Sequence, residues 1–260
     1  MKTLKKIGIL HVILFASISL TAFVWNEPAD TKKQAVINES KNFVVLELFT
    51  SEGCNSCPPA EEVFARLAKD YKGKSVYLLN YHVDYFDRLG WKDAFGSAEN
   101  STRQKQYGQW LPSQVYTPQL IVNGSSEFIG SDEKSIRNAI TRAQDLQQTT
   151  TLQLEATISQ DVVRVNYKTT DIQAGDELHL ALIQKNGSTN VLRGENEGLK
   201  FDHTQIVINM VKVSIKGKAD GTAALTIPKS ALGKELEVIG LVQNNRNGKI
   251  HAANSVALVK

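Results

Sequence analysis

The chain contains two cysteines, Cys54 and Cys57, and they are separated by only two residues. The apolar run at 43–49 precedes them and predicts a buried strand, and residues 59–71 repeat apolar side chains at helical spacing. A thiol at a helix N-terminus faces unpaired backbone N–H groups, which stabilise the thiolate. We therefore expect Cys54 to attack disulfides and Cys57 to resolve the mixed disulfide.

Two other uses of the cysteine pair stay open. A structural disulfide would stabilise the fold little, because the ring that it closes is short. A copper or zinc site could use Cys54, Cys57 and a nearby His82, but zinc usually takes four ligands. The other candidate ligands, His179, His203 and His251, are scattered along the chain. We expect no resident metal and no cofactor.

The length and composition of the chain favour two globular domains. At 260 residues with 42% hydrophobic residues, it can bury two moderate cores. The net charge of +3 is small, and Lys and Arg do not cluster with aromatic residues, so we expect no nucleic-acid partner.

The N-terminus resembles an export segment. Lysines follow Met1, and an apolar stretch continues to Val24, so residues 1–25 predict an export signal or an uncleaved N-terminal anchor. Residues 26–42 are polar and predict a linker. We therefore expect the folded part in the periplasm or cell envelope, possible membrane tethering at the N-terminus, and envelope or secreted thiol proteins as partners.

The pattern of elements changes near residue 148. Further strands are predicted at 76–83, 117–123 and 127–130, followed by a helix at 132–146 that Ser131 can cap. From 149 to 260, apolar residues alternate with polar ones in many short runs separated by turn signals. This pattern predicts an all-β antiparallel sandwich after an α/β domain at 43–148.

The first domain resembles the thioredoxin fold in its order of strand, cysteine pair, helix and strand, with Thr117-Pro118 leading into a later strand. The resemblance implies a cis bond at Thr117-Pro118, where Thr117 and Pro118 lie beside the cysteines and bind the substrate backbone. It also implies that Glu47, on the strand before the cysteines, is a buried carboxylate that exchanges protons with the second thiol.

The chain is similar over both domains to a bacterial exported thioredoxin-like family of unknown function, domain of unknown function 1223. The matching stretches are 46–54, Cys57-Pro58-Pro59, 81–85, 89–93, 116–119, 193–196 with Gly198 and His203, and 241–243. This family label carries no reaction, so the resemblance implies function only by analogy with thioredoxin.

Two segments depart from the plain thioredoxin pattern. Asn55-Ser56 lies between the cysteines without proline, and an aromatic insertion occupies 84–111. The insertion could form a substrate groove or lid, or it could simply pack onto the domain. We expect His82 and Trp91 to contact the substrate, and we expect residues 193–196 to form an interdomain turn.

The sequence thus predicts an exported thiol–disulfide oxidoreductase that acts on protein or small-molecule disulfides. The alternatives are a non-catalytic thioredoxin-like binding module of the cell envelope, and a metallochaperone that uses the two thiolates.

Overall fold

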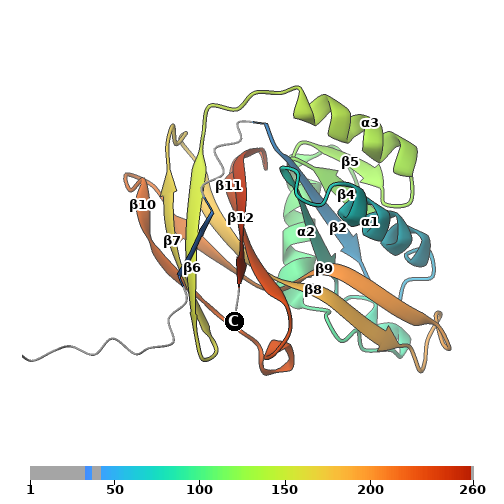
Figure 1. Ribbon diagram of the computed structural model, residues 1–260. Coiled ribbons are helices and arrows are strands. Elements are labelled where there is room, and N and C mark those ends of the chain that lie inside the picture. The colour runs from blue at the N-terminus through green and yellow to red at the C-terminus, as the bar shows by residue number, and fades with distance from the viewer. Residues whose placement is uncertain (1–32, 37–41, 259–260) are drawn as a thin grey trace, which may run out of the picture. The chain divides into compact units, whose positions relative to one another are not determined.

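The computed structural model describes residues 33–36 and 42–258 (Figure 1). The predicted export segment at 1–25 lies outside the described residues. The described residues all belong to one compact unit, Thr31–Lys260. Within the described part of the chain, none of the helices has the length and apolar character needed to cross a membrane.

Strands outnumber helices in this unit. The strands are β1 (Lys33–Val36), β2 (Val44–Thr50), β3 (Val76–His82), β4 (Gln119–Val122), β5 (Ser126–Ile129), β6 (Leu152–Ser159), β7 (Val162–Thr169), β8 (Asp176–Asn190), β9 (Lys200–Ser214), β10 (Asp220–Thr226), β11 (Leu236–Asn244) and β12 (Ile250–Leu258). The helices are α1 (Pro58–Asp70), α2 (Ala98–Trp110) and α3 (Glu133–Gln144), with short 3-10 turns η1 (Asp87–Leu89) and η2 (Lys229–Ala231).

The larger of two sheets runs through most of the unit in the order β12-β11-β8-β9-β3-β2-β4-β5. It is mixed: β2 and β3 are parallel, β3 and β9 are parallel, and the remaining neighbours are antiparallel. The protein is therefore mostly β, with one large mixed sheet and few helices. Strands before and after residue 148 share this sheet, so the predicted change of pattern there does not interrupt the packing.

The smaller sheet has the order β1-β6-β7-β10 and is antiparallel throughout. Apolar side chains that alternate along β6 and β7 pack with those of β8, β11 and β12 in one core. Strand β1 belongs to the segment predicted as linker. It pairs with β6 instead, because β6 is otherwise an edge of this sheet.

Helices cover both faces of the β2–β3 region. Helices α1 and α3 share a core with Leu46 and Leu48 of β2, whereas Val45 and Phe49 pack on the opposite face with Tyr107 of α2 (Figure 1). Successive β2 side chains thus point alternately toward α1 and α3 on one face of the sheet and toward α2 on the other. This division decides which residues can reach the start of α1.

Helix α2 lies inside the predicted aromatic insertion and was not predicted as a helix. Ser97 caps it by accepting a hydrogen bond from the Asn100 N–H. Its buried face is largely polar and includes Asn100, Arg103 and Gln104, so no apolar periodicity marks it in the sequence. At α3, Asp132 rather than Ser131 is the capping residue.

Candidate functional site around the Cys54–Cys57 disulfide

Cys54 and Cys57 form a disulfide in the turn between β2 and α1. Cys57 is the N-cap residue of α1, and Pro58 begins the helix. Proline is favoured there because its missing N–H would have no helical partner. Both cysteines are buried, with exposed fractions of 2% and 0%, whereas Asn55 and Ser56 between them are exposed. The disulfide therefore lies just beneath an exposed dipeptide.

Thr117 contacts this turn directly. Its hydroxyl donates to Cys54 Sγ at 3.2 Å, and the Ser56 hydroxyl donates to the Thr117 carbonyl oxygen at 3.3 Å. The Thr117-Pro118 bond is cis, as the thioredoxin resemblance implied. The structure thus brings together Cys54, Cys57, Thr117 and Pro118, which sequence reasoning had grouped.

Part of the aromatic insertion lies against the same turn. A Cβ atom at Gly53 would come within 3.1 Å of the Phe86 Cβ atom, so the turn and the insertion approach each other closely at this glycine. Tyr85 packs on Phe86, with ring centroids 5.1 Å apart. These two rings are half-buried and form one wall beside the disulfide turn.

Asn196 holds the turn from the second half of the chain. Its side-chain amide donates to the carbonyl oxygens of Glu52 and Cys54 at 2.8 and 2.9 Å. The sequence marked 193–196 as a family-specific stretch, but the pattern gave no reason to place Asn196 against the cysteine turn.

Glu47 does not lie beside the cysteines, contrary to the expectation for a proton shuttle. It points to the α2 face of β2, where it accepts a 2.6 Å hydrogen bond from Arg103 Nε and a further one from the Tyr107 hydroxyl. The cysteine turn leads into α1 on the other face, which carries Leu46 and Leu48. Glu47 and Arg103 form a buried ion pair, and Arg103 also contacts His179 and Gln243.

His82 and Trp91, which we expected to contact the substrate, lie next to the cysteine turn. Trp91 donates from Nε1 to Glu52 Oε2 at 2.7 Å, and His82 is fully buried at the end of β3. Asp84, which follows β3, accepts a hydrogen bond from Ser101 of α2. None of these three side chains has a described contact with Cys54 or Cys57. His82 belongs to a polar interior next to the turn, whereas Asp84 and Trp91 are half-buried.

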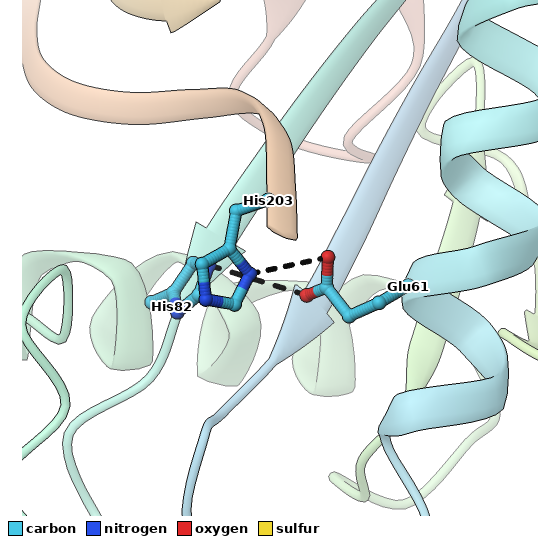
Figure 2. A group of neighbouring side chains, drawn as sticks. All are labelled: Glu61, His82 and His203. Atoms are coloured by element: carbon cyan, nitrogen blue, oxygen red, sulfur yellow. Dashed lines mark ion pairs between the residues drawn. The ribbon is translucent and has the colours of Figure 1, made fainter. Parts of the chain in front are cut away.

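That interior contains a cluster of Glu61, His82 and His203, called here the histidine cluster (Figure 2). Glu61 comes from α1, His82 from β3 and His203 from β9, and all three are buried. Asn80 and His82 share the α1 face of β3 because side chains two positions apart point the same way. Asn80 donates to both carboxylate oxygens of Glu61 at 3.2 and 3.0 Å.

The charged groups of the cluster shift one another's pKa values. Burial lowers the pKa of His203, but the carboxylates of Glu52 and Glu61 outweigh this and raise it to about 9. Burial raises the pKa of Glu61, and His203 and His82 outweigh it, so the net shift is downward. The pKa of Asp93 is likewise lowered, because burial is outweighed by His82. The cluster therefore favours ionised carboxylates.

Comparison with known proteins places the chain in a family. The chain is similar to the crystal structure of protein AGR_C_4864 from Agrobacterium tumefaciens, with 26% sequence identity and a TM-score of 0.60. The match covers 85% of this chain and 96% of that one. HBP35 of Porphyromonas gingivalis has the same fold at 19% identity and a TM-score of 0.60, over 85% of this chain and 77% of that one. No curated protein matches. The family described as "Protein of unknown function (DUF1223)" matches residues 45–243, and the chain belongs to this family.

Proposed function

We propose that the protein is an exported thiol–disulfide oxidoreductase whose redox centre is the Cys54–Cys57 pair. The observation that carries the proposal is the disulfide at the N-terminus of α1, with the Thr117 hydroxyl 3.2 Å from Cys54 Sγ. A helix N-terminus stabilises a thiolate, and a hydroxyl donor at the sulfur adds to that effect.

The order of elements supports a thioredoxin-like arrangement for residues 43–148. Strand β2 leads through the cysteine turn into α1 and then to the parallel strand β3, and the β4–β5 hairpin precedes α3. The insertion at 84–111 is the addition to this order: it contains helix α2, and its Phe86 approaches the cysteine turn. A disulfide in this position is also consistent with export, because such bonds persist outside the cytoplasm.

The proposed reaction exchanges two electrons. In the reduced protein, the Cys54 thiolate attacks one sulfur of a substrate disulfide, forms a mixed disulfide and expels the other substrate sulfur as a thiolate. The Cys57 thiolate then attacks Cys54 Sγ, which releases the second substrate thiolate and forms the Cys54–Cys57 bond. The substrate is reduced to a dithiol while the protein is oxidised. The reverse sequence oxidises a substrate dithiol.

The burial of both sulfurs favours one competing function, a binding module held by a structural disulfide. The reduction potential separates the two. Redox-active pairs lie between about −270 and −120 mV, whereas structural disulfides of secreted proteins lie below about −300 mV.

The test equilibrates the purified protein with glutathione redox mixtures and measures the fraction of the Cys54–Cys57 disulfide by alkylation and mass spectrometry. Turnover is then followed with a fluorescent disulfide peptide and glutathione as electron donor. A potential in the redox-active range and turnover that Cys54→Ser abolishes would support the proposal. A potential below the range of the glutathione pool, with no turnover, would support the binding module.

A further inference from the structure

The histidine cluster has the ligand set of a metal site. Two imidazoles and one carboxylate form the three-ligand set of many zinc sites. His82 Nε2 lies 4.0 Å from Glu61 Oε1, and His203 Nδ1 lies 3.4 Å from Glu61 Oε2 (Figure 2). All the candidate ligand atoms lie within 4.8 Å of one another. A tetrahedral ion with bonds of about 2.1 Å holds its ligand atoms roughly 3.4 Å apart, so a small contraction would suffice.

The two nitrogen atoms that face Glu61 are also the ones without hydrogen bonds. Within the described residues, neither His82 Nε2 nor His203 Nδ1 makes a hydrogen bond of good geometry, and each faces the Glu61 carboxylate at the ion-pair distance given above. The residues are 0% and 2% exposed, so bulk water does not reach the side chains freely. Buried polar atoms normally have partners, and an exception calls for an explanation such as an ion. Both exceptions here point toward the same carboxylate.

The opposite nitrogen of each imidazole is held by a second carboxylate. His82 Nδ1 lies 2.8 Å from Asp93 Oδ2, and His203 Nε2 lies 3.0 Å from Glu52 Oε1. This arrangement directs the free lone pair of each ring inward, as in the carboxylate–histidine–metal pattern of known sites. Asn80 fixes the Glu61 carboxylate in the same manner. Each of the three ligands thus has a partner that sets its orientation.

The charge balance of this interior also favours a cation. Glu52, Glu61 and Asp93 are three buried carboxylates, and the ion pairs found for them in the described part of the chain are all with His82 or His203. Metal binding requires neutral imidazoles. A divalent ion bound to Glu61, His82 and His203 would therefore take the place of an imidazole proton as the counter-charge of these carboxylates.

We propose that Glu61, His82 and His203 bind one divalent transition-metal ion of the zinc class. The three ligands come from α1, β3 and β9, so the ion would cross-link the start of the disulfide-bearing helix to both halves of the chain. The cysteines take no part in this site. It therefore differs from a metallochaperone site built on thiolates.

The test uses purified, untagged protein with its disulfide oxidised, freed of metal by a chelator. Titration with Co²⁺ is expected to give one bound ion per chain, with the visible absorption of nitrogen and oxygen ligands and without thiolate charge-transfer bands. Zn²⁺ is expected to displace Co²⁺ and to raise the melting temperature, because it binds the folded state. The Cys54→Ser/Cys57→Ser variant is expected to bind equally well, which separates this result from the outcome of the redox assays.

Matched variants locate the ion. Glu61→Gln, His82→Gln and His203→Gln are each expected to weaken Zn²⁺ binding by at least tenfold. Asp93→Asn removes only the orienting carboxylate and is expected to weaken it by about 10- to 100-fold. His179→Gln changes a buried histidine outside the cluster and is expected to leave binding unchanged. Circular dichroism reports whether each variant is folded.

Two results would overturn the proposal. The first is failure of the wild-type protein to bind Co²⁺ or Zn²⁺ at one ion per chain, which needs no variant to interpret. The second is binding that the cysteine double variant loses while folded His82→Gln and His203→Gln retain it.

Discussion

Asn196 donates a hydrogen bond of 2.9 Å to the carbonyl oxygen of Cys54, which lies 142 positions earlier in the chain. The same amide donates to the Glu52 carbonyl oxygen. One side chain from the loop between β8 and β9 therefore satisfies two buried backbone acceptors of the cysteine turn. A buried acceptor without its donor costs free energy, which makes this contact measurable.

Asn196→Ala should lower the free energy of unfolding of the oxidised protein by about 2 kcal/mol, because the buried Glu52 carbonyl loses its side-chain donor and the Cys54 carbonyl keeps only the Cys57 N–H. Urea denaturation measures the change. Asn209→Ala is the matched control, since Asn209 donates to the Thr226 carbonyl oxygen at an exposed position. Equal effects of the two substitutions would mean that the Asn196 contacts do not stabilise the turn.

Cys57→Ser should accumulate a mixed disulfide with a substrate peptide through Cys54, whereas Cys54→Ser should accumulate none. Cys54 Sγ accepts a hydrogen bond from the Thr117 hydroxyl and lies 3.3 Å from the hydroxyl of the exposed Ser56, whereas Cys57 is fully buried at the N-cap of α1. Non-reducing electrophoresis with mass spectrometry detects the adduct, and the double serine variant gives the background. Equal trapping by both single variants would remove the assignment of the nucleophile.

Glu47→Gln should destabilise the protein by about 3–5 kcal/mol, because it leaves the buried Arg103 guanidinium without its counter-charge. Denaturant unfolding measures this loss. The control is Glu62→Gln, which removes an exposed pair with Arg66 and should change stability by less than about 1 kcal/mol. Disulfide exchange by the folded fraction should be unchanged in Glu47→Gln. A large loss of exchange rate in a stable variant would instead restore the proton-shuttle role.

His179 should make the protein less stable in mild acid. Burial and the neighbouring Arg103 lower the pKa of His179 well below its usual value near 6.5. Below about pH 6.5 the unfolded chain takes up a proton at His179 that the folded protein excludes. The contribution of neutral His179 to the free energy of unfolding is therefore complete above pH 6.5 and is lost as the pH falls toward the lowered pKa.

His179 alone should change the free energy of unfolding by up to about 1.4 kcal/mol per pH unit in this range, and His179→Gln should remove this pH dependence. Glutamine keeps an acceptor for Arg103 but does not titrate. The measurement compares urea unfolding of both proteins at several pH values between 7.5 and 5. Parallel stability curves would show that His179 does not control the acid response.

Local patterns were sufficient to predict the elements around the disulfide. The apolar run before Cys54, the helical spacing after Pro59 and the alternation beyond residue 149 each reflect one-sided or two-sided burial, which the sequence records directly. Helix α2 was not predicted because it has no apolar stripe: its buried face includes the polar residues Arg103 and Gln104.

The site was only partly predictable. Cys54 and Thr117 were grouped through a resemblance, and the structure places them in contact. Glu47 was expected beside the cysteines, whereas its side chain pairs with Arg103 on the α2 face. A strand buried on both sides gives no periodic signal of which face meets α1. The histidine cluster could not be foreseen: His203 reaches Glu61 through the pairing of β3 with β9, which no local pattern encodes.

That pairing also affects how the protein can be made. Until residue 206 has been synthesised and has met Asn80, strand β3 has an open edge that other chains could extend. The first half of the chain is therefore prone to aggregation until β9 has been synthesised and has paired with β3. A chain cut between α3 and β6 would retain the cysteine turn but leave this edge permanently open.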